Sequence, residues 1–124
     1  MAARWKKSPP ELVALFDAVL ACEPRAERRQ MFGYPAAFAN GNMVTGLHQD
    51  DWMLRLDELG RAALAKDGAR AFEPTPGRPL REYVVLPAAL RGDPSALARW
   101  VKRAFDYTSA LPARKSTKVA RKKE

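Results

Sequence analysis

Apolar residues recur at helical spacing near the beginning and near the end of the chain, which predicts a helix at each place. The first stripe follows Ser-Pro-Pro-Glu at residues 8–11, an S-x-x-E capping box whose prolines occupy first-turn positions. It ends near Cys22, because the residue before Pro24 is disfavoured in a helix. The last stripe follows an N-cap and first-turn proline at residues 93–94, and Pro112 stops it. The apolar positions are Leu12, Leu15, Phe16, Val19 and Leu20 in the first helix, and Leu97, Trp100, Val101, Ala104, Phe105 and Thr108 in the last.

Between these helices the apolar period shortens, which predicts strands. Residues 28–39 form one predicted strand, broken by Gly33 and Pro35, and the Asn-Gly pair at 40–41 predicts a hairpin turn. Strands over 42–48 and 51–56 follow. A short helix over 58–66, capped by Asp57, and two further strands near 71–73 and 81–86 complete the pattern. In strand 51–56, one face carries Trp52, Leu54 and Leu56, and the other carries Met53 and Arg55.

The predicted order is helix, three strands, helix, two strands, helix (α-β-β-β-α-β-β-α). Because strands and helices do not strictly alternate, we expect an α+β fold rather than a parallel, doubly wound one. The expected architecture is an antiparallel five-stranded sheet with the helices packed on one face, forming one domain over residues 8–112. The stretch from Asn40 to Leu56 is accordingly interpreted as the hairpin core of this sheet, although it holds the chain's only histidine, His48.

Charge is concentrated at the two ends of the chain. The net charge is +8, of which residues 1–7 carry +3 and residues 114–124 carry +5, so the body between them is neutral. Residues 113–124 have no apolar period and are predicted to form a solvated basic tail. Without interleaved aromatic residues, the tail would bind nucleic acid through phosphate alone, and its other interpretation is a solubilising end. The candidate nucleic-acid contacts are Arg114, Lys115, Lys118, Arg121, Lys122 and Lys123.

The sequence predicts no catalytic, cofactor or metal site. One cysteine and one histidine cannot build a disulfide or the usual zinc ligand sets, and neither a phosphate-binding loop nor a G-x-S-x-G motif occurs. No apolar run approaches the ~20 residues of a membrane span, and no secretory signal is recognisable, so we expect a cytoplasmic protein without membrane contact.

The turn over residues 76–83 is the best candidate for a small binding site. Arg78 and Arg81 could hold a phosphate or carboxylate bidentately, beside Tyr83. In the alternative interpretation, both arginines pair with Glu73 and Glu82 and only fix the turn.

Two segments also resemble a known family: QMFGYPAAFANGNMVTGLHQDDWMLRL (30–56) and AFEPTPGRPLREYVVLP (71–87). They are similar to the TfoX N-terminal domain family, named for the TfoX/Sxy regulators of natural competence. The resemblance covers roughly residues 10–112, and its most specific parts are MFG at 31–33 and FEPTPGRPLREYV at 72–84. It implies an α+β fold like that of secretion chaperones, in the element order given above.

The resemblance implies less about function. Full-length TfoX/Sxy proteins add a C-terminal helical domain and promote transcription of competence genes with the cyclic-AMP receptor protein, whereas residues 113–124 offer only a basic tail. The resemblance assigns no catalytic residue.

Two functions therefore stay open. The first is a non-enzymatic regulatory or adaptor domain that contacts nucleic acid through its basic ends or a protein through its sheet face, with a symmetric homodimer as a further expectation. The second is a small-molecule or anion-binding domain, enzymatic or not, built on Arg78 and Arg81. An arginine-lined pocket closed by Tyr34 or Tyr83 would favour the second, and an open apolar sheet face would favour the first.

Overall fold

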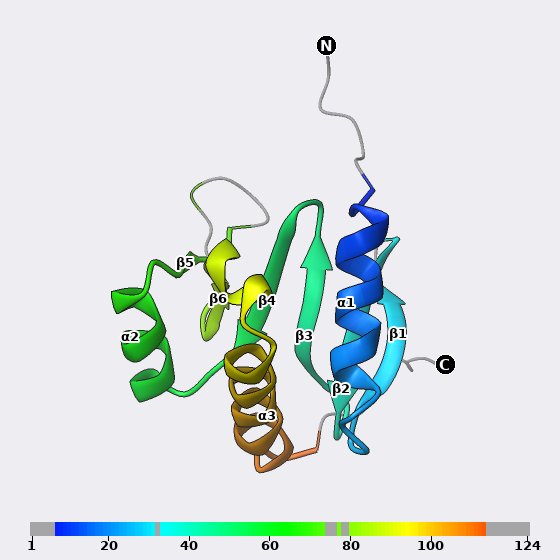
Figure 1. Ribbon diagram of the computed structural model, residues 1–124. Helices are drawn as coiled ribbons and strands as arrows, with labels where there is room; N and C mark the ends of the chain where they lie inside the picture. The colour runs from blue at the N-terminus through cyan, green and yellow to red at the C-terminus, as the bar shows by residue number, and fades with distance from the viewer. Residues whose placement is uncertain (1–6, 32, 74–76, 78–79, 114–124) are drawn as a thin grey trace.

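The computed structural model describes residues 7–31, 33–73, 77 and 80–113, and within them it shows helices packed on one antiparallel sheet (Figure 1). The strands lie in the order β1-β2-β3-β4-β6-β5. The predicted α+β class is confirmed, but the sheet has six strands and not five. The elements are α1 (Pro10–Leu20), β1 (Glu27–Met31), β2 (Tyr34–Ala39), β3 (Asn42–His48), β4 (Asp51–Arg55), α2 (Glu58–Lys66), β5 (Arg70–Ala71), β6 (Tyr83–Val85), the 3-10 helix η1 (Ala88–Gly92) and α3 (Pro94–Ser109).

The additional strand arises where one strand was predicted over residues 28–39. Gly33 has a φ of 84°, and the chain reverses there so that Met31 of β1 pairs with Tyr34 of β2. Glycine takes this left-handed conformation without steric cost, so the residue expected to break a strand instead joins two strands in a hairpin. A register shift does occur nearby, between Ala37 and Phe38 of β2 where they pair with β3.

The helix ends follow the predicted caps in two of three cases. The carboxylates of Asp57 and Asp93 each accept a hydrogen bond from a backbone N–H in the first turn of α2 and α3, at 3.2 Å in both. The capping box predicted at Ser8 does not form, because α1 begins at Pro10 with Pro9 as its N-cap and no side-chain cap bond. Pro9 is extended, with φ −59° and ψ 141°, which moves the helix start one residue beyond the position that would let Ser8 act as the cap.

The main core lies between the sheet and the helices α1 and α3, which cover the same face (Figure 1). Trp52 of β4 is fully buried there, with its ring 5.2 Å from that of Phe16 of α1. Its indole N–H donates a 2.8 Å hydrogen bond to the hydroxyl of Thr45, which in turn donates to the carbonyl of Met53. The interpretation of this stretch as hairpin core is confirmed.

The opposite face of the sheet, here called the second face, is also apolar. Met53 and Val85 are buried on it and pack with Phe72, which follows β5. Backbone hydrogen bonds from Phe72 to Tyr83 and from Leu80 to Phe72 hold part of the β5–β6 connection in place. No helix in the described part of the chain is long and apolar enough to cross a membrane.

Candidate functional site

A hollow of about 170 Å³ lies on the second face. We call it the apolar pocket. Its walls come from strands β1 to β4 and from the β5–β6 connection, so it is formed by segments far apart in the sequence. The lining residues are Met31, Tyr34, Pro35, Ala36, Met43, Leu47, His48, Met53, Phe72 and Leu80.

The hollow lies where β2 presents a small residue, Ala36, to the second face. Ala36 pairs with Gly46 of β3, which pairs with Met53 of β4. The end of the Met53 side chain lies over Gly46, where an added Cβ atom would be 3.1 Å from Cε of Met53 and 3.5 Å from Cβ of Ala36. Ala36 therefore leaves room for the hollow, and longer side chains surround it.

The walls of the apolar pocket are aromatic rings and thioethers. The ring of His48 lies between those of Tyr34 and Phe72, at centroid distances of 5.2 and 5.6 Å. Three methionines complete the lining, and this flexible, polarizable side chain adapts its shape to irregular apolar partners. Among the described residues no group of three or more His, Cys, Asp or Glu is placed to hold a metal ion.

Only part of the predicted anion site lies within the described residues. Arg78 lies outside the described residues, and Arg81 is exposed and does not line the apolar pocket. Tyr83 donates its hydroxyl to the carbonyl of Met43 at 2.8 Å. Glu73, expected to pair with the turn arginines, accepts a hydrogen bond from the backbone of Gly77.

Glu82, the other expected partner, instead joins β6 to β4 and α3. Its carboxylate accepts hydrogen bonds from Arg55 at 2.8 Å and from the Tyr107 hydroxyl at 2.7 Å. Burial opposes ionisation of this carboxyl, but the bonds from Tyr107 and Arg55 outweigh it and lower the pKa of Glu82. The same hydrogen bond raises the pKa of Tyr107. Glu82 has a φ of 75°, unusual for a residue with a side chain, so this network holds a strained position in place.

Arg81 does lie in a depression, which sequence reasoning missed. It lines a shallow hollow of about 460 Å³ between α2 and the strands β5 and β6, here called the arginine groove. Arg61 of α2 and Arg70 of β5 line it as well, and Leu80 lines both this groove and the apolar pocket. No pattern along the chain indicates this arrangement, because Arg61, Arg70 and Arg81 belong to different elements and meet only through the packing of α2 beside the sheet.

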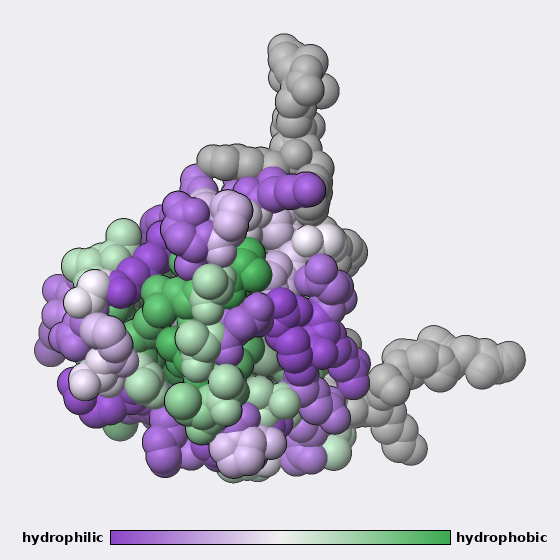
Figure 2. All heavy atoms as spheres, turned by 45° about the vertical axis from the view of Figure 1, so that its right-hand side comes forward, coloured by the Kyte–Doolittle hydropathy of each residue, from purple (hydrophilic) through white to green (hydrophobic). Residues whose placement is uncertain are grey.

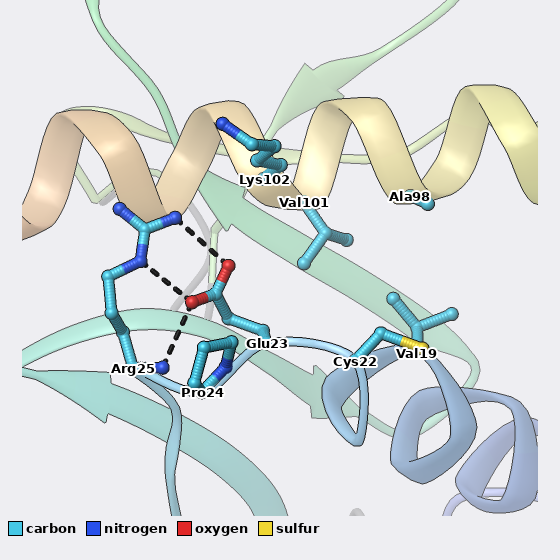
Figure 3. A pocket seen from close by; sticks show the side chains of 8 residues that line it. All are labelled: Val19, Cys22, Glu23, Pro24, Arg25, Ala98, Val101 and Lys102. Carbon is cyan, nitrogen blue, oxygen red and sulfur yellow. Dashed lines mark hydrogen bonds and ion pairs between the residues drawn. The ribbon is translucent and has the colours of Figure 1, made fainter.

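A third hollow, of about 370 Å³, separates α1 from α3. Figure 3 shows Val19 and Val101 facing each other across it, and Figure 2 shows apolar side chains gathered over these helices. Its charged groups satisfy one another: Arg25 binds Glu23 at 2.7 Å and Asp106 at 2.9 Å. The hydrogen bond from Arg25 lowers the pKa of both carboxyls.

Ion pairs also account for most arginines of the body. Six of them pair with carboxylates: Arg25, Arg28, Arg29, Arg55, Arg70 and Arg103. The described body is therefore no broad cationic surface, in agreement with its neutral sequence charge. The predicted nucleic-acid contacts at residues 114–123 lie outside the described residues.

A sheet with helices on one face and an apolar hollow on the other places the chain among small α+β domains with one sheet face left partly open. The family model described as the TfoX N-terminal domain matches residues 18–107. The chain belongs to this family, which confirms the resemblance of the two motif segments. No protein with a curated description matches the chain.

Proposed function

We propose that this protein is a non-enzymatic adaptor domain with a regulatory role, which recognises a partner protein by taking one large apolar side chain into the apolar pocket. The observation that carries the proposal is the pocket itself, a preformed hollow with thioether and aromatic walls on a sheet face that none of the described helices covers. Protein interfaces gain most of their affinity from a few large side chains inserted into such hollows. Membership of a family named for competence regulators supports the regulatory role.

The size of the apolar pocket favours a side chain over a whole metabolite. Sites for drug-sized ligands usually enclose about 300–1,000 Å³, whereas this pocket measures about 170 Å³. Its described lining includes no arginine or lysine that would fix a charged small molecule. The arrangement expected of an anion-binding domain, an arginine-lined pocket closed by Tyr34 or Tyr83, is therefore a poorer match than an anchor pocket for a protein.

Nucleic-acid contact is a separate part of the proposal, assigned to the basic residues 114–123. The support is the charge distribution: the described body neutralises most of its arginines internally, and the excess positive charge belongs to the ends of the chain. Such contact would be made to phosphate groups and would be sensitive to salt.

Site-specific photocrosslinking in the native cell tests the protein contact. The chain offers a matched pair of exposed leucines: Leu80 at the rim of the apolar pocket, 40% exposed, and Leu59 on α2, 75% exposed and absent from the pocket lining. A photoreactive phenylalanine analogue at position 80 should give a discrete crosslinked protein that the same analogue at position 59 does not give. Nuclease treatment before purification should leave this product unchanged.

The second part of the experiment repeats the crosslinking with variants whose pocket is filled or made polar. Ala36→Leu should remove the crosslink at position 80, because the added carbons occupy the space that the anchor needs. A thermal melt establishes that this variant is folded. Met31→Gln places a polar amide at a half-buried wall position of the same pocket. It should also weaken the crosslink, because an apolar anchor would bury that amide without a hydrogen-bond partner. Equal products from positions 59 and 80, or a product that survives both pocket variants, would refute the proposal.

A further inference from the structure

We infer that the arginine groove binds an acidic segment of the same partner, directly beside the apolar anchor. This inference rests on the proposed function and specifies the chemistry of the partner: an apolar side chain followed or preceded by carboxylates.

The cationic groups of the arginine groove are available to a ligand. In the described part of the chain, Arg81 is exposed and makes no ion pair. Arg61 donates to the carbonyl of Leu56 at 2.6 Å, which positions its guanidinium, and its charge also interacts with that of Glu82 without a salt bridge between them. The other described arginines without a carboxylate partner, Arg91 and Arg99, do not line this groove. Two guanidiniums that form no salt bridge with a described residue thus line one hollow, whereas six other described arginines pair with carboxylates.

The acidic residues in the lining do not cancel these charges. Glu82 directs its hydrogen bonds to Arg55 and Tyr107, which lie outside the groove lining, and its interaction with Arg61 is the weaker, longer-range one. Glu58 is exposed in the first turn of α2, where a carboxylate interacts favourably with the helix dipole. Arg70 pairs with Asp51 at 2.8 Å, although both side chains remain partly exposed. An incoming carboxylate therefore meets Arg61 and Arg81 first, and guanidinium groups bind carboxylates with two parallel hydrogen bonds.

The shape of the arginine groove leaves room for a peptide backbone. Its walls include Ala62 and Ala65 of α2 and Ala71 of β5, all exposed and all too small to fill it. A segment lying between α2 and β6 can therefore approach the arginines without displacing a large side chain.

Leu80 joins the two hollows, because it lines both. A segment that places an apolar side chain in the apolar pocket would cross Leu80 and continue into the arginine groove. An extended chain advances about 3.3 Å per residue. Because the two hollows share Leu80, the acidic residues should lie within a few positions of the anchor.

Selection of twelve-residue peptides from a random displayed library against the full-length chain tests the inference. The selected peptides should share an apolar or aromatic residue with Asp or Glu within a few positions of it. The best peptide, synthesised and labelled, should bind Arg81→Glu and Ala65→Glu about fivefold or more weakly than the unsubstituted chain. Arg99→Glu is the matched control: it changes the charge as Arg81→Glu does, at another exposed and unpaired arginine, and should change the affinity less than twofold.

The outcomes separate the two proposals. Peptides that share the apolar residue and lose affinity with Ala36→Leu, but show no acidic preference or respond equally to Arg81→Glu and Arg99→Glu, would overturn the acidic-segment inference alone. Failure to select any peptide, or binding that is insensitive to Ala36→Leu, would overturn the proposed function and this inference with it. A DNA duplex that displaces the peptide from the unsubstituted chain and from Arg99→Glu, but not from Arg81→Glu, would assign the groove to nucleic-acid phosphate instead.

Discussion

Replacing Trp52 by alanine should cost the protein about 3–5 kcal/mol of unfolding free energy. The side chain is fully buried between the sheet and α1, against the ring of Phe16. Its removal loses the transfer free energy of a large aromatic and leaves a cavity in a closely packed core. Thr45 loses the indole as donor but keeps its own bond to the Met53 carbonyl, so the substitution leaves no buried donor unpaired. Since domains of this size unfold with about 5–15 kcal/mol, the variant should remain folded with a much reduced margin.

Urea unfolding followed by far-UV circular dichroism measures this loss, with the slope of the transition checked for constancy. Trp100→Ala is the control, because that side chain is only half-buried and should cost less. Trp52→Phe should fall between the two, since it keeps most of the apolar contact and loses the hydrogen bond to Thr45. A loss below about 1 kcal/mol for Trp52→Ala would mean that the side chain is not part of the core.

Two further predictions concern charge. Glu82→Gln should lower stability at neutral pH by about 1–3 kcal/mol. Because the folded-state pKa of Glu82 is lowered, its contribution is present above the unfolded pKa and is lost as the pH falls through the folded one. The difference from the unsubstituted protein in urea unfolding should therefore shrink below about pH 4.5, and a constant difference would contradict the ionic role. Deleting residues 113–124 should remove most duplex DNA binding and leave the thermal midpoint nearly unchanged. For the full chain, the slope of log affinity against log salt concentration should be no steeper than roughly −5. Equal DNA binding by the truncated chain would place the site on the body.

The parts of the fold that the sequence predicted well are those set by local chemistry. Asn40 and Gly41 have φ values of 56° and 77°, the positive angles that a type I′ turn requires. Asp57 and Asp93 cap their helices with their own side chains. Trp52, Leu54 and Leu56 are all fully buried, as their alternation in one strand predicted.

Where the sequence was ambiguous, the missing information was which strands pair. Gly33 is compatible with a bulge within one strand and with a turn between two, because both use a positive φ. Only the pairing of Met31 with Tyr34 decides for the turn. The strand predicted at 71–73 is likewise displaced to Arg70–Ala71, where pairing with β6 sets its position.

The apolar pocket shows why a site made by strand register escapes a strand-by-strand interpretation. Strict alternation would put Met43 of β3 on the same face as Thr45, whose hydroxyl bonds to Trp52 in the main core. The register shift opposite Ala37 and Phe38 inserts one extra residue into β3, and Met43 packs on the second face instead.

That shift also brings Met43 to the same side of the sheet as Ala36. Met43 then forms part of the wall of the apolar pocket, next to the small Ala36 at its centre. Neither residue is informative by itself: a methionine and an alanine in strands are usually core. What makes them a site is their placement across three strands beneath the β5–β6 connection, which no pattern along one strand contains. The same holds for the arginine groove, since Arg61 and Arg81 belong to α2 and to the β5–β6 connection and share a hollow only once α2 lies beside β6. Variants at these positions therefore test the register and packing of the fold together with its function.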